Sequence, residues 1–256
     1  MPNPTAAMLV IGDEILSGRT RDSNMNHLAK RLTEAGIDLR EARMVPDEAA
    51  EIIAALDALR SRYTYVFTSG GIGPTHDDIT ADCVAQAFGV GIDVREDARA
   101  ILATNYANPE TELNAARLRM ARIPDGAELI DNPVSKAPGF RIGNVHVMAG
   151  VPAVFEAMVE GVLPTLTGGA PLRSHSLRVF LAEGTVAGPL GEIAAANADV
   201  SIGSYPFQRE GRFGCTLVAR AQDTARLTSV AAEIRAMAEG LGATDILETP
   251  PDAALA

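Results

Sequence analysis

The 256-residue chain contains no tryptophan and only two cysteines, Cys83 and Cys215, which lie far apart. Neither belongs to a Cys-x-x-Cys pair or to a cluster with histidine, so the sequence predicts neither a disulfide framework nor a zinc site. No apolar run approaches the roughly 20 residues that span a bilayer, and the N-terminus lacks the basic and apolar regions of a signal peptide. We therefore expect a soluble, cytoplasmic protein with reduced thiols and no membrane partner.

Positive charge is also scarce, since 22 Lys and Arg residues stand against 33 Asp and Glu residues and the formal net charge is −11. Broad binding of nucleic acid depends on basic side chains that neutralise phosphates, so this charge balance argues against a nucleic-acid partner. A small basic pocket for one nucleotide remains compatible with it. The apolar fraction of 47% and the charged fraction of 21% are typical of globular proteins, and the length corresponds to one or two domains.

Short apolar runs in the first part of the chain are followed by helical patterns. The run 7–11 is continuously apolar, as expected of a strand that is buried on both faces of a sheet. The repeated strand-helix order predicts a doubly wound, mostly parallel α/β sheet. We also predict a helical insertion at 90–124 and a helix at 153–163. The predicted strands are 7–11, 37–45, 63–68, 129–130, 140–142 and 145–148.

A turn-rich stretch, Leu-Thr-Gly-Gly-Ala-Pro at 166–171, indicates a domain boundary. We predict a first domain at 1–168 and a second, smaller α+β domain at 172–248. The order expected in the second domain is strand, helix, strand, strand and helix, with a short first helix at 190–196. Residues 249–256 contain two consecutive prolines and few apolar anchors, so we expect a flexible tail there.

A glycine-rich loop at Thr68–Thr80, with the sequence TSGGIGPTHDDIT, joins a predicted strand to a predicted helix. Gly70, Gly71 and Gly73 can adopt a positive φ and carry no side chain that would obstruct a ligand. The free N–H groups at the start of the following helix attract anions, above all phosphate. The loop therefore predicts a site for a small phosphate-bearing molecule.

Two carboxylates in the same loop, Asp77 and Asp78, would repel phosphate. They are compatible with a phosphate site if a divalent cation or a positively polarised group lies between them and the ligand. An alternative is that Thr75, Asp77 or Asp78 caps the following helix, which is a frequent use of these residue types. The neighbouring His76 could ligate a metal, although a single histidine in a polar loop is more often solvated.

Further acidic residues follow the first two predicted strands. Asp13 and Glu14 come directly after the first strand, and Asp47 follows the second. Ligands of open α/β sheets bind at the carboxyl ends of the strands, so these groups and the glycine loop predict one common site. Asp47 is also a natural N-cap for the next helix. Lys136, in a Pro- and Gly-rich loop at 131–140, could neutralise a phosphate or could be an ordinary surface lysine.

Several of these motifs occur together in the order known from one family. They resemble the molybdenum-cofactor-biosynthesis (MoaB/Mog-type) domain and, more closely, the N-terminal part of the competence/damage-inducible protein A (CinA) family. The resemblance covers roughly residues 7–245. The motifs are Gly12–Gly18 (GDEILSG), Asp22, Asn24, Val45–Asp47 (VPD), Thr68–Thr80, Ala137–Phe140 (APGF), Gly150–Pro152 (GVP) and Ser204–Pro206 (SYP).

The resemblance implies a molybdopterin-binding-like α/β fold with its ligand at the glycine-loop end of the sheet. The two acidic positions of the molybdopterin enzymes match Asp47 and Asp78. In the CinA group this domain is associated with metal-dependent hydrolysis of the pyrophosphate of ADP-ribose or similar nucleotides. Full-length relatives carry a further nicotinamide-mononucleotide deamidase domain, which the resemblance does not extend to here. Because relatives self-associate, a homo-oligomer is implied as well.

The chain departs from the family pattern at two places. Gly73–Asp78 (GPTHDD) replaces the Arg-Asp form of the molybdopterin enzymes, which removes a cation, adds a carboxylate and favours a metal ion. Ala149 and the segment 152–156 depart from the usual Pro-Gly-Val-Pro-x-Glu-Met form, which leaves the role of Glu156 open.

Three functions follow as hypotheses. The first is a nucleotide pyrophosphatase that uses Mg²⁺, Mn²⁺ or Co²⁺ and acts on ADP-ribose or a related dinucleotide such as FAD. The second is a molybdopterin-binding or adenylyl-transferring protein, and the third is a nucleotide-binding module without catalysis. The candidate ligand-binding residues are Gly12, Ser69, Gly70, Gly71, Gly73, Thr75 and Lys136. The candidate metal ligands are Asp13, Glu14, Asp77 and Asp78, and the candidate catalytic residues are Asp47 and Asp78.

Overall fold

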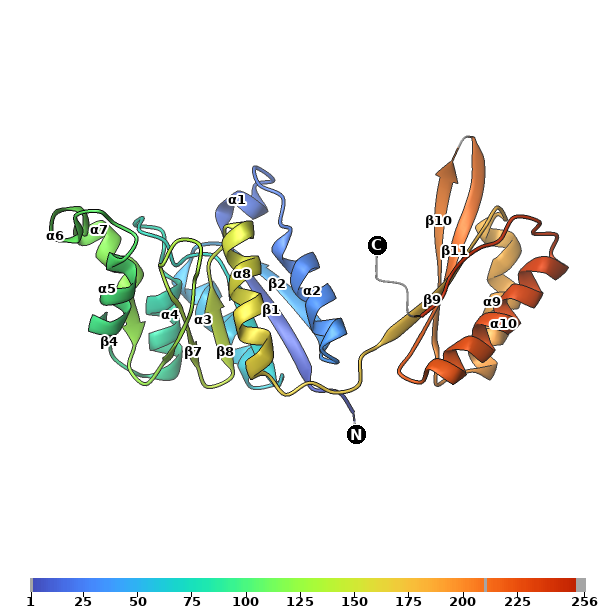
Figure 1. The fold of residues 1–256 in the computed structure, drawn as a ribbon, viewed down its shortest axis with the longest axis horizontal. Helices are drawn as coiled ribbons and strands as arrows, with labels where there is room; N and C mark the ends of the chain where they lie inside the picture. The colour runs from blue at the N-terminus through green and yellow to red at the C-terminus, as the bar shows by residue number, and fades with distance from the viewer. Residues whose placement is uncertain (1, 210, 252–256) are drawn as a thin grey trace. The chain divides into compact units, whose positions relative to one another are not determined.

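The computed structural model describes residues 2–209 and 211–251 (Figure 1). It divides into two compact units, Met1–Gly169 and Ala170–Ala256, which are described separately below. None of the helices in the described residues combines the length and apolar character needed to cross a bilayer.

The first unit is built on a six-stranded sheet with the order β2-β1-β3-β8-β7-β6. Strands β2, β1, β3 and β8 are parallel to one another. Strand β7 is antiparallel to β8, and β6 is antiparallel to β7. The mostly parallel sheet predicted from the sequence is therefore confirmed. Its strands are β1 Thr5–Ile11, β2 Asp38–Val45, β3 Tyr65–Ser69, β6 Glu128–Ile130, β7 Gly139–Ile142 and β8 Val145–Met148.

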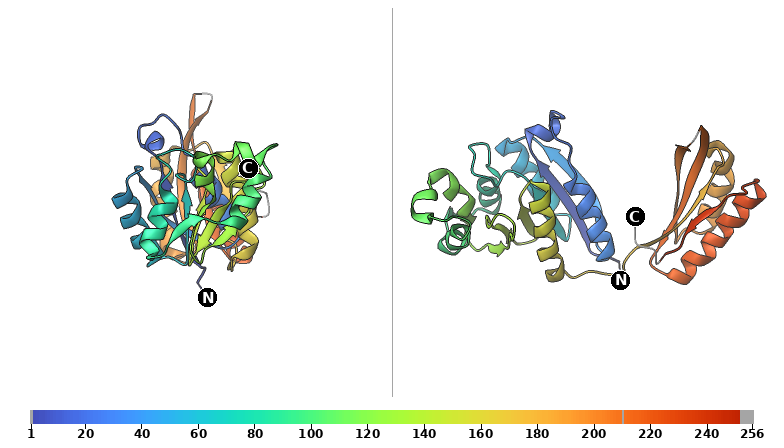
Figure 2. Two further views of the ribbon diagram at one scale, coloured as in Figure 1. Left: turned by 90° about the vertical axis from the view of Figure 1, so that its left-hand side faces the viewer. Right: turned by 45° about the horizontal axis from the view of Figure 1, so that its top comes forward.

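Helices cover both faces of this sheet, as Figures 1 and 2 show. Alternate residues of β1 point to opposite faces, so Ala7 and Leu9 belong to one apolar core and Ala6 and Met8 to the other. The first core packs against α3 and α4, and the second against α2 and α8. These helices are α2 Asn24–Glu34, α3 Ala49–Arg60, α4 Thr80–Phe88 and α8 Pro152–Val162, with a single-turn helix α1 at Asp13–Leu16.

The insertion between α4 and β6 is mainly helical but also contains a two-stranded antiparallel sheet that we did not predict. Each of its strands has three residues, which is too short to display an alternating pattern. The insertion comprises β4 Ile92–Val94, α5 Glu96–Ala103, α6 Pro109–Glu112, α7 Ala115–Leu118, the 3₁₀ helix η1 Arg119–Ala121 and β5 Arg122–Pro124.

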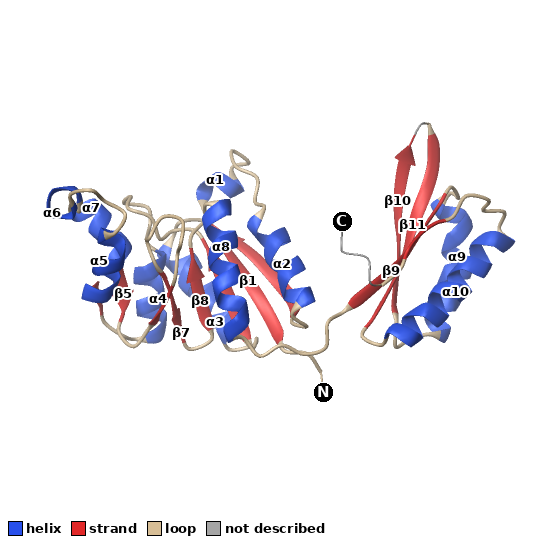
Figure 3. Ribbon diagram, in the orientation of Figure 1, coloured by secondary structure: helices blue, strands red, loops and turns tan. Residues whose placement is uncertain are grey.

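The second unit is a four-stranded antiparallel sheet, ordered β10-β11-β9-β12, with α9 and α10 on one face (Figure 3). The predicted strand-helix-strand-strand-helix order is followed by one extra strand that contains Thr249, a residue we had expected in the tail. Residues 252–256 lie outside the described residues. The elements are β9 Arg173–Val179, α9 Glu183–Ala196, β10 Ser201–Arg209, β11 Arg212–Ala221, α10 Thr224–Gly240 and β12 Leu247–Thr249.

Helix α9 is longer than predicted, because it starts at Glu183 and contains Pro189. The prediction of 190–196 treated the proline as a helix boundary, which is the usual effect of its missing N–H group. Glycine and alanine predominate in the first half of α9, so the apolar periodicity there is weak as well.

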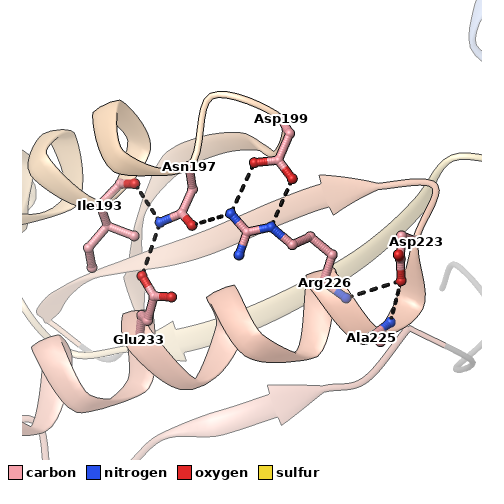
Figure 4. Close-up of polar contacts among 7 residues, drawn as sticks. All are labelled: Ile193, Asn197, Asp199, Asp223, Ala225, Arg226 and Glu233. Carbon is pink, nitrogen blue, oxygen red and sulfur yellow. Dashed lines mark hydrogen bonds and ion pairs between the residues drawn. The ribbon is translucent and has the colours of Figure 1, made fainter.

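A polar network holds the end of α9 to α10 (Figure 4). Arg226 donates to both carboxylate oxygens of Asp199, over 2.8 and 3.0 Å, and to Oδ1 of Asn197 over 2.5 Å. The amide nitrogen of Asn197 in turn donates to the Ile193 carbonyl and to Glu233. Asn197 is only 4% exposed, so these partners satisfy an otherwise costly buried amide.

One histidine, His146 of β8, is buried in the first unit with an exposed fraction of 2%. Its ring stacks on Phe67 with the ring centroids 5.0 Å apart. Burial disfavours the charged imidazolium and lowers the pKa of His146 to about 4. The folded protein therefore holds this ring neutral over a pH range in which the unfolded chain protonates it.

Acid is therefore expected to destabilise the first unit through His146. Stability from the neutral ring is complete above the unfolded pKa of 6.5 and is lost as the pH falls toward about 4, by up to about 3 kcal/mol. Denaturant unfolding of wild type and His146→Leu across this range should show a shallower pH dependence in the variant. His76→Gln is the matched control, since His76 is 98% exposed, and should leave the slope unchanged. An identical slope in wild type and His146→Leu would contradict the assignment.

Candidate functional site

The carboxyl ends of four neighbouring parallel strands bring the predicted site segments to one edge of the sheet. The Gly12 N–H donates to the Val45 carbonyl over 3.2 Å, which joins the ends of β1 and β2. The Gly70 N–H donates to the Met148 carbonyl over 3.2 Å, which joins the ends of β3 and β8. Residues that are up to 140 positions apart in the sequence therefore meet at this edge, as the strand pattern predicted.

The glycine loop is packed too closely for side chains. Gly70 and Gly71 have φ values of 106° and 68°, a region that favours glycine. A Cβ atom on Gly70 would lie 2.2 Å from the Ile11 carbonyl oxygen, and one on Gly71 would lie 2.1 Å from Oγ1 of Thr80. The fully buried Thr80 donates its hydroxyl to the Gly70 carbonyl and its N–H to the Gly71 carbonyl, over 3.0 and 2.9 Å. A ligand at this loop therefore meets backbone only.

Asp78 folds back onto the loop that precedes it. Its carboxylate accepts from the N–H and the hydroxyl of Thr75, over 2.8 and 2.5 Å. A Cβ atom on Gly73 would lie only 2.7 Å from Oδ2 of Asp78, so the carboxylate leaves no room for a side chain there. The cap position of α4 is occupied by Ile79, which makes no side-chain cap bond, so Asp78 positions the Thr75 turn rather than the helix.

Asp47 is not the cap of α3, contrary to our prediction, because Glu48 occupies that position. Its carboxylate instead accepts from the Asp13 N–H over 2.9 Å, across the paired ends of β2 and β1. Burial raises the pKa of Asp47, and the negative charges of Asp13, Glu14 and Asp77 raise it further. The carboxylates of three loops thus influence one another, which supports a common site.

The predicted metal ligands do not form a ready-made cage. Among residues 2–209 and 211–251, no group of three or more His, Cys, Asp or Glu side chains is arranged to hold a metal ion. Asp77 is 60% exposed, and His76 beside it is 98% exposed with its Nδ1 3.9 Å from that carboxylate. Mg²⁺ is commonly held by one or two carboxylates together with substrate phosphates, so the donor set suits an ion that binds with its nucleotide. Metal binding stays a prediction.

A cation that the sequence analysis missed lies beside the glycine loop. Arg119 of η1 lines a cleft with Gly71, Gly73 and Asp78, and its Nη2 donates to the Asp78 carbonyl over 2.9 Å. Its Nε is buried and has no hydrogen-bond partner in the described part of the chain. Arg122 lines the same cleft but is paired through two 2.7 Å bonds. Arg119 follows the loop by some 40 positions, and no local motif marks it.

Lys136 lies in a turn between β6 and β7 and has a φ of 58°, the only positive φ of a non-glycine residue in the described ranges. Asn132, which is fully buried, builds this turn by accepting from the Val134 and Ser135 N–H groups and by donating to the Ala137 carbonyl. Pro138, two residues after Lys136, lines the cleft of Arg119. A strained backbone held by a buried amide is a common feature of ligand sites.

The glycine loop, the acidic strand ends and the α/β sheet together define a small-molecule-binding domain of the molybdopterin-binding class. Residues 7–168 match the family described as "probable molybdopterin binding domain", and the chain belongs to this family. Residues 171–244 match the family described as "FAD synthase, middle domain", which we had not anticipated. The resemblance inferred from the motifs is confirmed.

Individual relatives support the same assignment. A CinA-like protein of Citrifermentans bemidjiense is 41% identical over 189 residues, covering 71% of this chain and 46% of the relative. A protein of Archaeoglobus fulgidus is 32% identical over 199 residues, covering 78% of this chain and 84% of the relative. The chain thus spans about half the length of the CinA-like relatives that it matches.

Among solved structures, CinA of Thermoplasma acidophilum is similar with a TM-score of 0.59 and 34% identity. This similarity covers 63% of the present chain and 97% of that one. The share of this chain that is covered corresponds in length to the first unit.

The raised pKa of Asp47 predicts that Asp47→Asn stabilises the protein at neutral pH. The folded state holds the Asp47 proton to a higher pH than the unfolded chain does, so ionised Asp47 lowers stability as the pH rises through the acid range. The amide oxygen of asparagine still accepts from Asp13. Thermal melts should therefore show a higher Tm for Asp47→Asn at neutral pH, and the difference should shrink as acid protonates Asp47 in the wild type.

The matched control for this experiment is Asp57→Asn, because Asp57 is half exposed in the last turn of α3, which leads to the amino end of β3 and not to the acidic edge. Its Tm should follow that of the wild type at every pH. A lower Tm of Asp47→Asn at neutral pH would contradict the repulsion inferred among the carboxylates.

Proposed function

We propose that the first unit is a metal-dependent nucleotide pyrophosphatase that acts on ADP-ribose or a related dinucleotide such as FAD. The observation that carries this proposal is a backbone-only glycine loop with carboxylates on one side and an incompletely paired arginine on the other. A molecule bound there needs a negatively charged group, such as a pyrophosphate, that can coordinate the same cation as the carboxylates. Matches to CinA-like proteins and to the FAD synthase middle domain agree with a nucleotide ligand.

The phosphates would lie on the glycine loop. Helix α4 begins at Thr80, so the first-turn amides of Ala81 and Asp82 have no acceptor within the helix, and both residues line the Arg119 cleft. Such amides attract phosphate, and the Arg119 guanidinium adds a positive charge beside them. The exclusion of side chains at Gly70 and Gly71 would allow the phosphate oxygens to approach the backbone closely.

The carboxylates would supply the remaining chemistry. A divalent ion, when bound with the nucleotide by Asp78, Asp77, Asp13 or Glu14, would polarise the bridging phosphate and acidify water. Asp47, whose pKa is raised by burial, would accept the proton of the attacking water. The water oxygen would then bond to phosphorus while the bridging P–O bond breaks, which would yield AMP and a second phosphate monoester.

A second candidate function is binding of molybdopterin, and the match of residues 7–168 to a probable molybdopterin binding domain favours it. The cleft supports this alternative too, because Arg119 compensates for the arginine that the loop sequence lacks. Calorimetry with molybdopterin separates the two candidates, since the pyrophosphatase hypothesis requires no affinity for the pterin.

Hydrolysis should depend on Asp78. Purified protein with Mg²⁺, Mn²⁺ or Co²⁺ is expected to release AMP from ADP-ribose or FAD, and Asp78→Asn should lower kcat by about 10²–10⁴-fold with little change in nucleotide affinity. Chromatography of the products measures the former and calorimetry the latter. Asp57→Asn again serves as the control and should retain full turnover. Absence of AMP with all three metals and with ADP-ribose, FAD and NAD would refute the proposal.

Arg119 should contribute mainly to binding. Arg119→Gln is expected to weaken ADP-ribose binding about tenfold or more, and Arg119→Lys should recover part of the loss because it retains the charge. Arg117→Gln is the matched control, since Arg117 lies in the same insertion but stacks on Tyr106, with its guanidinium carbon 4.6 Å from the ring centroid. Equal affinities of Arg119→Gln and Arg117→Gln would show that Arg119 does not contact the ligand.

A further inference from the structure

A second pocket lies at the same edge of the sheet, on the side of α2 and α8, whereas the Arg119 cleft lies on the side of α4. Its cavity volume is about 50 Å³. The residues Ser69–Gly71 lead from this pocket to the cleft, because Ser69 lines the first and Gly71 lines the second. The polar and charged residues that line it are Glu14, Thr20, Arg21, Asp22, Ser23, Asn24 and Ser69.

Asn24, at the start of α2, is the central polar residue of this pocket and is only 3% exposed. Its amide nitrogen donates to the Gly150 carbonyl over 2.7 Å and to Oγ of Ser69 over 2.8 Å. A carbonyl oxygen can only accept, so the nitrogen of Asn24 must face Gly150, and this fixes the orientation of the amide. Its oxygen Oδ1 is consequently left buried and has no hydrogen-bond partner in the described ranges. Such a buried acceptor requires an explanation.

The groups around Asn24 define what could supply the missing donor. Oγ of Ser69 accepts from Asn24, so the Ser69 hydroxyl proton remains available to a ligand. The Glu14 carboxylate adds a further acceptor. The group that Oδ1 lacks must carry an O–H or N–H, which a fully ionised phosphate does not. A hydroxyl group both donates and accepts, so neighbouring hydroxyls fit all three side chains.

The size of the pocket limits the ligand further. One water needs roughly 10–15 Å³ of such a cavity, so about 50 Å³ has room for a few small polar groups. The hydroxyl-bearing edge of a sugar fits this volume and this chemistry. Ser69 directly precedes Gly70 and Gly71 in the chain, so a sugar in this pocket would lie next to phosphates bound on the glycine loop. Such a sugar and such phosphates could therefore belong to one ligand.

We propose that the Asn24 pocket binds the vicinal hydroxyls of a sugar that is linked through the pyrophosphate to the nucleotide. This inference rests on the proposed function in one respect, namely that the phosphates occupy the glycine loop. Oδ1 of Asn24 and the Glu14 carboxylate accept from the sugar hydroxyls, and the Ser69 hydroxyl donates to one of them. Asn24 is thereby a residue that determines specificity for a sugar on the second phosphate.

The test compares two ligands that differ only in these hydroxyls. One is ADP-ribose, and the other is the ADP ester of tetrahydrofurfuryl alcohol, which keeps the ring and the pyrophosphate. Calorimetry in EDTA and again with Ca²⁺ should give the wild type about a tenfold or greater preference for ADP-ribose. Asn24→Ala should reduce this preference, because one of the sugar contacts is lost while the phosphate contacts remain.

A purely structural role of Asn24 gives a different result, since loss of its bonds to Ser69 and Gly150 would weaken both ligands by one common factor. That result, or equal affinities of the wild type for the two ligands, would overturn the proposal. If Asn24→Ala fails to fold, Glu14→Gln provides the same comparison and should reduce the preference, whereas an unchanged preference would count against the pocket. A wild type that prefers ADP-ribose but releases no AMP would refute the pyrophosphatase and retain the sugar pocket.

Discussion

The bonds between Thr80 and the glycine loop are the contacts on which the site depends. Thr80 is fully buried and holds the Gly70 and Gly71 carbonyls, while Gly71 leaves no room for a side chain against its hydroxyl. A Cβ on Gly150 would lie 3.1 Å from Gly70, so β8 approaches the loop almost as closely. The start of α4 and three strand ends are thereby fixed together, which concentrates backbone donors in one place.

The charges around this loop are divided between its two sides. Burial raises the pKa of Asp47, and the negative charges of Asp13, Glu14 and Asp77 add to this effect. Arg119 stands on the other side with an unsatisfied Nε. Repulsion among carboxylates lowers stability unless a positive group relieves it, so a ligand that brings a cation, as we propose, would stabilise this edge. This is the electrostatic pattern of sites in which phosphate and a divalent ion bind together.

How much the sequence could predict follows from how local each feature is. Strand β1 was found because it is buried on both faces and is a continuous apolar run. The glycine loop was found because glycine spacing is a local property. The bond from Asp13 to Asp47 depends on the pairing of β1 with β2, so we wrongly predicted Asp47 as the cap of α3. Arg119 reaches the loop only through an insertion whose course no periodicity reveals.

The two pockets beside the loop also bear on the choice between the candidate functions. Asn24 lies on one side of the loop with an unsatisfied acceptor, and Arg119 lies on the other with an unsatisfied donor. A ligand that satisfies both must be anionic in the middle and must carry hydroxyls beyond its phosphates. A pterin that ends in one phosphate monoester carries N–H donors, but its anionic group lies at one end and not in the middle. A dinucleotide with a second sugar satisfies both sides at once, which favours the pyrophosphatase over the pterin-binding function.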